Sequence, residues 1–204
     1  IELAEQLLSE EEKHPVAQPI PTSSLYSALD ISLNSEGVVD SELIENLKSI
    51  IKSTPKTATK SFFNQLFGGR ISKATLGDLL AVMLNNSMYT YKVAGPQVGI
   101  EKQVLKNICN LIDYSQDSDG TLAPGGSMSN MMALIMARDA KNSAIRTEGI
   151  STKVTLYTSA ESHYSISKNA ALTAIGRKQV RFVNTDERGE MLIDHLETLI
   201  KTDL

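Results

Sequence analysis

A loop of glycines and serines ahead of an apolar helix is the first feature of the sequence that could do chemistry. It reads Gly125-Gly126-Ser127-Met128-Ser129-Asn130. The first free N–H groups of the helix and its dipole favour an anion such as a phosphate, and the serine hydroxyls add donors. A helix cap without any ligand fits the same pattern. The spacing matches neither common nucleotide-binding glycine motif.

His163 is the second candidate, in the run Ser159-Ala160-Glu161-Ser162-His163-Tyr164-Ser165. It follows an expected strand and begins an expected helix, the place where parallel sheets bind ligands. A histidine there could stack on a ring or move protons, and it could equally be a helix-start residue bonded to backbone. His14 and His195 have no cysteine or carboxylate partner at ligand spacing, so no zinc site is predicted.

Two further patterns allow more than one interpretation. Aromatic and amide side chains occur together at residues 62–66 and 89–91, where residue type alone favours core or interface. Ser129 and His163 could be the nucleophile and base of a serine hydrolase. The strand–Gly-x-Ser-x-Gly–helix elbow of that class is absent, so phosphate anchoring fits better.

The elements that must position these residues alternate between helix and strand. Patterns predict helices at 129–141 and 165–175, strands at 154–158 and 179–183, and a helix at 195–201 capped by Asp194. This order predicts a parallel sheet with crossover helices, hence an α/β fold. The methionines at 128, 131, 132 and 136 predict a buried helix.

The first half of the chain reads as helices joined by extended segments. Helices are expected at 1–13, 40–52, 75–86 and 96–113, with a proline-rich extended stretch at 14–24 and a strand-like piece at 28–33. Proline removes a backbone donor and restricts the residue before it. Residues 1–57 are expected to form an N-terminal segment, and residues 58–204 an incomplete larger domain.

Composition excludes several classes of function. Of 204 residues, 41% are hydrophobic and 22% charged, typical of a globular protein, and the net charge of -4 offers no basic surface for nucleic acid. No apolar run approaches the roughly 20 residues that span a bilayer. The single cysteine, Cys109, fits a cytoplasmic protein. All methionines lie at position 83 or later, so we expect a segment of a longer protein.

Taken together, a set of short motifs resembles the group II pyridoxal-phosphate-dependent amino-acid decarboxylases, the glutamate, cysteine-sulfinate and aspartate enzymes. The resemblance covers roughly residues 28 to 200. The motifs are Phe62-Phe63-Asn64-Gln65-Leu66, Tyr89-Thr90-Tyr91, Asp119-Gly120, Pro124-Gly125-Gly126-Ser127-Met128-Ser129-Asn130-Met131, Ala137-Arg138, Thr158-Ser159, Ser162-His163-Tyr164-Ser165 and Asp186-Glu187-Arg188-Gly189.

The resemblance implies the aspartate-aminotransferase-like (type I) fold of PLP-dependent transferases, a homodimer, and pyridoxal 5'-phosphate as cofactor. Carried over by position, the amides of Met128 and Ser129 and the Ser129 hydroxyl hold the phosphate, supported by Ser127. His163 stacks on the pyridine ring and is the catalytic residue. The residues expected to meet the acidic substrate are Gln65, Leu66, Phe67 and Tyr89.

The same resemblance implies limits. The family's Schiff-base lysine, in a Pro-His-Lys context, is absent from these residues, so residues 1–204 alone are expected to be an inactive part of a carboxy-lyase of amino-acid metabolism. The sequence departs from the family pattern at Thr59-Lys60-Ser61 and at Lys92. Tyr89 favours aspartate or cysteine sulfinate over glutamate. A non-catalytic homologue that keeps the fold is the alternative.

Overall fold

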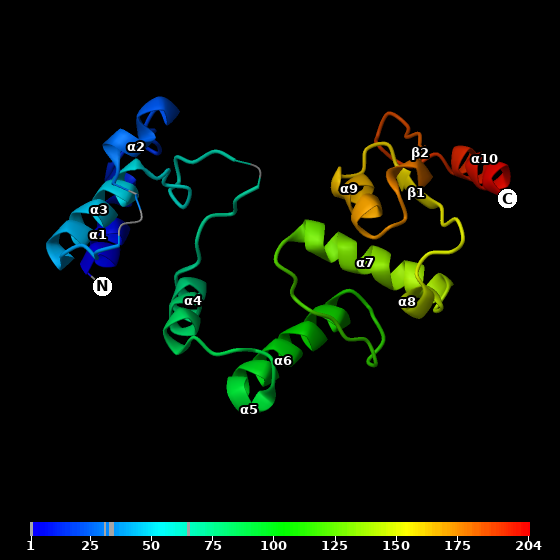
Figure 1. Ribbon diagram of the computed structural model, residues 1–204, viewed down its shortest axis with the longest axis horizontal. Coiled ribbons are helices and arrows are strands. Elements are labelled where there is room, and N and C mark those ends of the chain that lie inside the picture. Colours follow the sequence, from blue (N-terminus) through cyan, green and yellow to red (C-terminus); the bar gives the residue numbers. More distant parts are fainter. Residues whose placement is uncertain (1, 31, 33–34, 65) are drawn as a thin grey trace. The chain divides into compact units, whose positions relative to one another are not determined.

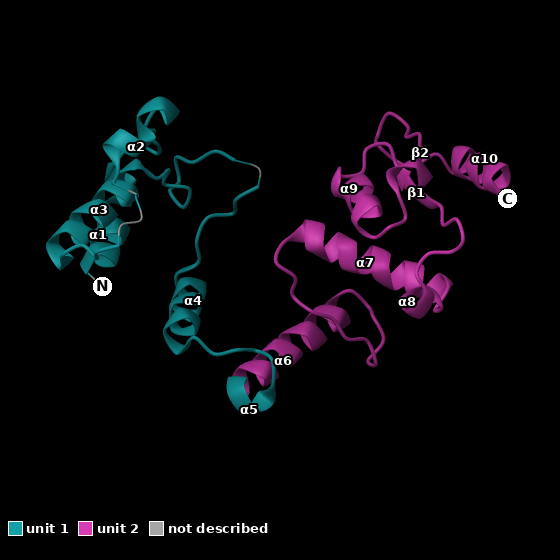
Figure 2. Cartoon of the chain, in the orientation of Figure 1, with its two compact units in different colours: residues 1–95 teal, residues 96–204 magenta. Residues whose placement is uncertain are grey.

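The computed structural model describes residues 2–30, 32, 35–64 and 66–204, and the chain divides into two compact units, Ile1–Gly95 and Pro96–Leu204 (Figure 2). The sequence predicts a boundary between residues 57 and 58, where an N-terminal segment meets an incomplete larger domain. That boundary stays a prediction.

Unit 1 is helical throughout its described part, apart from extended connections (Figure 1). The first helix ends at Glu10 and a short 3-10 turn follows, in agreement with the expected 1–13 segment. Its elements are α1 (Glu2–Glu10), η1 (Glu11–Lys13), η2 (Thr22–Ser24), α2 (Leu25–Ala28), α3 (Asp40–Ser53), α4 (Ser72–Leu84) and α5 (Tyr91–Ala94).

The strand-like piece expected at 28–33 is wrong in its described part. Ala28 ends helix α2, and Leu29, Asp30 and Ser32 lie outside any strand, while Ile31 and Leu33 are outside the described residues. The Asp30 carboxylate accepts hydrogen bonds from the Ser32 backbone N–H at 3.2 Å and from its hydroxyl at 2.6 Å. A local side-chain turn of this kind competes with strand pairing.

Unit 2 contains the predicted parallel pairing. Strand β1 (Leu156–Ser159) pairs with β2 (Val180–Val183), with Leu156 opposite Val180. Helix α9 (Ser165–Leu172) connects them, which is the crossover that parallel strands require. The remaining elements are α6 (Pro96–Leu111), α7 (Gly126–Lys141), α8 (Ile145–Glu148), η3 (Arg177–Gln179) and α10 (Ile193–Asp203).

The core of unit 2 lies between α9 and the strands. Ala170, Ile175 and Val180 form its buried cluster, with Val154 and Leu156 packed against it. Val183 is fully buried, a contribution of about 2 kcal/mol for a side chain of its size. This small core packs the second half of α9 against the strands.

Two expectations about helices in unit 2 need correction. Leu192, rather than Asp194, is the N-cap of α10, and Asp194 lies inside the first turn, where its charge suits the helix dipole. The expectation of a buried methionine-rich helix is also wrong here, because Met136 is 70% exposed and Met128 is 38% exposed. The α9 side of α7 makes polar contacts instead, through Asn130 and Arg138.

None of the described helices combines the length and apolar character needed to cross a bilayer.

Candidate cofactor site

The glycine–serine loop opens α7, as predicted, and does so three residues earlier than the pattern indicated. Gly125 is the N-cap, with φ +94 and ψ 157, a conformation that only glycine adopts readily. Its carbonyl accepts the amides of Met128 at 3.1 Å and Ser129 at 3.2 Å, which starts the helix. Glycine is therefore required at position 125 by the turn itself.

Gly126 has no such backbone requirement. A Cβ built on either Gly125 or Gly126 would meet no atom within 4 Å, so the space beside the helix N-terminus is open. The helix start supplies backbone N–H groups ahead of the first helical bonds, and the residues there include the hydroxyl-bearing Ser127 and Ser129. Donors, a helix dipole and open space fit a phosphate group.

The amides assigned to the phosphate by resemblance, those of Met128 and Ser129, donate to Gly125 within the helix start. The Ser129 hydroxyl makes a long contact of 3.4 Å to the Gly125 carbonyl, which is at the weak end for a hydrogen bond. These phosphate-binding roles stay predictions.

His163 precedes α9 and lines a hollow of about 440 Å³ in unit 2. Its ring packs on that of Tyr164, with centroids 4.2 Å apart and planes inclined by 37°. Its Nδ1 lies 2.8 Å from the Ser165 hydroxyl and accepts the Ser165 backbone N–H at 3.2 Å. The hollow is lined by Ser162, His163, Tyr164, Ile166, Ser167, Lys168, Arg177 and Phe182.

The structure brings the loop and the histidine together through polar contacts between α7 and α9. The Asn130 side-chain amide donates to the Ser165 hydroxyl at 2.8 Å, and that of Asn169 donates to the Ser127 carbonyl at 2.8 Å. Arg138 donates to the Thr173 carbonyl at 2.6 Å. Thus the phosphate-loop candidate and the ring-stacking candidate are parts of one bonded assembly.

Sequence reasoning missed Asn169, which is 1% exposed and anchors Ser127. A signal was present: Ser165, Asn169 and Thr173 recur every four residues, and all three are buried. Polar side chains at that spacing share one helix face, and buried polar groups need partners. Such a stripe indicates a second polar surface opposite, which α7 supplies.

The residues expected to meet the substrate lie in unit 1. Leu66 is 78% exposed and Tyr89 is 89% exposed within that unit. Phe67 contacts Phe62, with ring centroids 6.0 Å apart. Gln65 is outside the described residues. Their substrate roles stay predictions.

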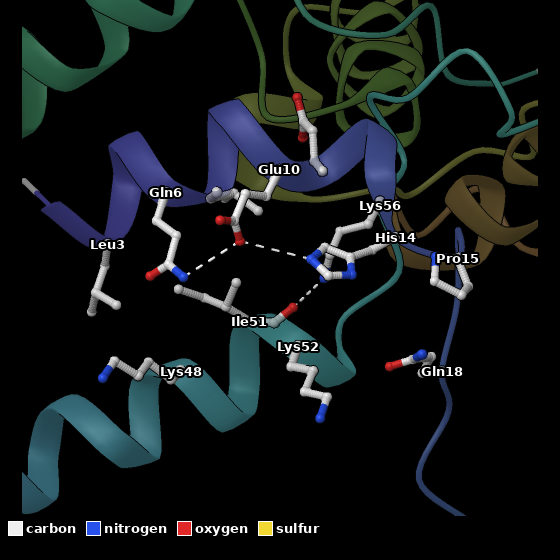
Figure 3. Close-up of a pocket in the computed structure, with 12 residues that line it drawn as sticks. Leu3, Gln6, Glu10, His14, Pro15, Gln18, Lys48, Ile51, Lys52 and Lys56 are labelled. Carbon is white, nitrogen blue, oxygen red and sulfur yellow. Dashed lines mark hydrogen bonds and ion pairs between the residues drawn. The ribbon is translucent and has the colours of Figure 1, made fainter.

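Unit 1 also has a hollow of about 500 Å³ beside α1 and α3 (Figure 3), and it contains none of the predicted site residues. Some of its polar groups contact one another or the end of α3. Gln6 and His14 both point at Glu10, at 3.4 and 3.7 Å. Lys56 donates to the carbonyls of Ile51 and Thr54 at the end of α3, a structural cap.

The chain matches one family along most of its length. The pyridoxal-dependent decarboxylase conserved domain matches residues 23–204. The chain is 39% identical to human cysteine sulfinic acid decarboxylase over 178 residues, which is 86% of this chain and 36% of the relative. It is 35% identical over 179 residues to an acidic amino acid decarboxylase of Xenopus tropicalis, covering 87% of this chain and 35% of that protein.

Solved structures agree. The crystal structure of mouse CSAD superposes with a TM-score of 0.89 at 34% identity, over 98% of this chain and 46% of that one. An Oryza sativa TDC structure with PLP and tryptamine, at 18% identity and a TM-score of 0.80 over 99% of this chain and 46% of that one, shows the likeness of fold alone. The predicted fold is confirmed. The chain spans about a third of the length of the curated relatives it matches.

Proposed function

Since this chain belongs to the pyridoxal-dependent decarboxylase family, we propose that it is part of an enzyme that removes the α-carboxyl group of an acidic L-amino acid. The products are carbon dioxide and the corresponding amine. The family is PLP-dependent, and the donor groups at the start of α7 fit the cofactor's phosphate.

One observation carries the proposal. Asn130–Ser165 and Asn169–Ser127 hydrogen bonds join the Gly-Gly-Ser-Met-Ser-Asn loop to the Ser-His-Tyr-Ser segment, although the two are far apart in the chain. A cofactor that has a phosphate at one end and an aromatic ring at the other needs these two segments to be held together.

The chain's own residues would bind the cofactor and orient it. Pyridoxal 5'-phosphate, when bound, supplies the electron sink that accepts the bonding pair as carbon dioxide leaves. Ser127, Met128 and Ser129 would hold the phosphate. His163 would lie against the ring and carry the proton that the product carbon must receive, which makes it the catalytic residue of this part of the protein.

We propose aspartate or cysteine sulfinate, ahead of glutamate, as substrate. The relatives support an acidic substrate by their own names, which include cysteine sulfinic acid decarboxylase and glutamate decarboxylase. Tyr89 supports the shorter acids, because the family's glutamate enzymes often carry phenylalanine there. Gln65, Leu66 and Phe67 would meet the distal acidic group.

We also propose a cytoplasmic homodimer. The dimer is supported by apolar side chains of α3 and α4 that are exposed in unit 1, among them Leu43, Leu47, Leu76 and Leu79. A subunit interface would bury such side chains, and a closed pair with two-fold symmetry is the commonest arrangement.

Residues 1–204 by themselves are proposed to be inactive, because they include no Pro-His-Lys sequence. The second candidate, a non-catalytic homologue that keeps the fold, rests on the same observation. The two differ in the longer protein, which has the cofactor-binding lysine only if the first proposal is right.

The test is an absorbance spectrum of the full-length protein purified with pyridoxal 5'-phosphate, before and after borohydride. We expect a visible cofactor band that reduction fixes to a lysine, and carbon dioxide release from aspartate or cysteine sulfinate. A folded protein without the band would leave the non-catalytic homologue. The band without release from any acidic amino acid would overturn the substrate class alone.

A further inference from the structure

Three polar side chains in unit 2 form a chain of hydrogen bonds that ends on the histidine ring. Asn130, on α7, donates from Nδ2 to Ser165 Oγ at 2.8 Å. Ser165 Oγ lies 2.8 Å from His163 Nδ1, and the Ser165 backbone N–H also points at Nδ1, at 3.2 Å. Ser165 is fully buried, so water does not substitute for these partners.

The directions of these bonds determine where the imidazole proton sits. A backbone N–H can only donate, so the contact with Ser165 favours Nδ1 as an acceptor without a proton. A neutral imidazole has one donor and one acceptor nitrogen, so the proton is on Nε2. The Asn130 NH₂ group is likewise only a donor. Ser165 Oγ accepts from it, which leaves the hydroxyl hydrogen available to point toward Nδ1, in keeping with the same assignment.

We propose that Asn130 and Ser165 are positioning residues that hold His163 as the Nε2-protonated tautomer. The proposal rests on the function proposed above, in which His163 meets the cofactor ring. Which ring nitrogen carries the proton is set by the bond that the other nitrogen makes. Here that bond comes from Ser165 of α9, whose hydroxyl accepts from Asn130 of α7. The helix whose first turn is the candidate phosphate site would therefore also help to orient the proton donor.

The alternative is a purely structural role, in which the contact caps α9 and joins two helices. Both roles predict lost stability when Asn130 or Ser165 is changed, so stability does not separate them. The response of the tautomer to side-chain changes does. In a capping role the proton stays on Nε2 when the Asn130 or Ser165 side chain is altered, because the Ser165 backbone N–H still donates to Nδ1. In a positioning role the same changes shift the proton toward Nδ1 before any ligand binds.

The test is a ¹⁵N spectrum of the full-length protein, labelled at histidine, recorded without cofactor and again with pyridoxal 5'-phosphate. Signals of His163 are assigned by their disappearance in His163→Gln. We expect a non-protonated Nδ1 and a protonated Nε2 in both samples. A wild-type His163 with its proton on Nδ1, or with both tautomers equally populated, would overturn the proposal without any further variant.

A matched pair of variants tests the bond chain. Asn130→Asp replaces the donor by an acceptor, so the Ser165 hydroxyl should turn toward it and accept from Nδ1–H. One hydrogen bond of ordinary strength corresponds to a shift of about fivefold in the tautomer ratio. Asn130→Ala removes the donor without offering an acceptor, and a smaller shift is expected. An unchanged ratio in folded Asn130→Asp protein would contradict the proposal.

Variants of Ser165 give a rescue experiment for the tautomer proposal, and cofactor binding tests the proposed function separately. Ser165→Ala should raise the Nδ1–H fraction, and Ser165→Thr, which keeps the hydroxyl, should restore the wild-type ratio. In the loaded enzyme Asn130→Asp should lower kcat by about tenfold or more while the cofactor band persists. A full-length protein that never binds the cofactor would contradict the proposed function. The tautomer of His163 without cofactor would still be tested by the ¹⁵N spectrum of the cofactor-free sample.

Discussion

The two units of the chain bury their apolar side chains to very different extents. In unit 2, Ala170, Ile175 and Val180 form a buried cluster, and side-chain hydrogen bonds join α7 to α9. In unit 1, α3 and α4 have no buried residues, and their apolar side chains are exposed. The candidate cofactor residues thus lie where the chain builds its own support, and the candidate substrate residues lie where it does not.

This contrast predicts two kinds of mutational effect. Changes in unit 2 should disturb cofactor binding, the chemical step and stability together. Changes in unit 1 should alter substrate preference and assembly while the cofactor band survives.

The largest effect is expected at His163. In the full-length enzyme, His163→Gln should lower kcat by roughly 100- to 10,000-fold, because a positioned acid–base group is lost. The visible cofactor band should remain, since glutamine leaves the phosphate contacts intact. Steady-state carbon dioxide release measures the loss. A kcat within threefold of wild type would remove His163 from the catalytic role.

The glycine pair gives a sharper test within unit 2. Gly125→Ala requires an alanine to adopt a positive-φ backbone conformation that almost only glycine occupies. We expect it to destabilise the protein by about 1–3 kcal/mol. Gly126→Ala is the control, because it has neither a positive φ nor a neighbour within 4 Å. It should leave the urea midpoint nearly unchanged and weaken cofactor binding. Equal midpoints for the two variants would contradict the strain argument.

Acid stability should depend on Asp203, which joins α10 to both strands. The Arg181 guanidinium, bonded to Asp203 at 2.6 and 2.8 Å, holds the pKa of that carboxyl below its usual value. Tyr157 donates to it at 2.9 Å. A lowered pKa means that the stabilisation is present above about pH 4, the unfolded value, and is lost as the pH falls through the folded one.

Asp203→Asn should therefore lower the urea midpoint at pH 7 and flatten its decline below about pH 4. Asp30→Asn is the control in unit 1. The pKa of Asp30 is also lowered, by hydrogen bonds from Ser32, but these bonds join near neighbours only. Its removal should change the midpoint less. If the two variants behaved alike, the contrast between the units would not extend to their charged groups.

The smallest effect is expected at Tyr89. Tyr89→Phe should change the ratio of kcat/KM for glutamate over cysteine sulfinate by a few-fold, toward glutamate, because one hydroxyl contact is removed. The cofactor band and the urea midpoint should stay as in wild type, since Tyr89 is 89% exposed within its unit. An unchanged ratio would leave the substrate preference without support from this residue.

Local patterns predicted the parts of the molecule that local forces determine. The strand–helix–strand order and the parallel pairing of the two strands are confirmed, because apolar periodicity and crossover geometry leave few alternatives. The glycine–serine loop was recognised as the start of a helix, and α7 begins there.

What the patterns missed depends on partners distant in the sequence. Met136 was expected inside, yet it is exposed, because α7 faces α9 through Asn130 and Arg138 instead. Asn169 carries no motif and its role appears only when Ser127 is placed opposite it. The false strand at 28–33 arose because the hydrogen bond between Asp30 and Ser32 is invisible to a pattern of apolar residues.

The pairing of β1 with β2 through a single short helix bears on how the protein is made. Leu156 and Val180 are close in the chain, so little loop entropy opposes their meeting. Domains fold during synthesis as their residues leave the ribosome. The β1–α9–β2 segment can close while later residues are still being translated, and Asp203 can then fasten α10 to Arg181. The histidine would thus be oriented on the nascent chain, well before a cofactor is met.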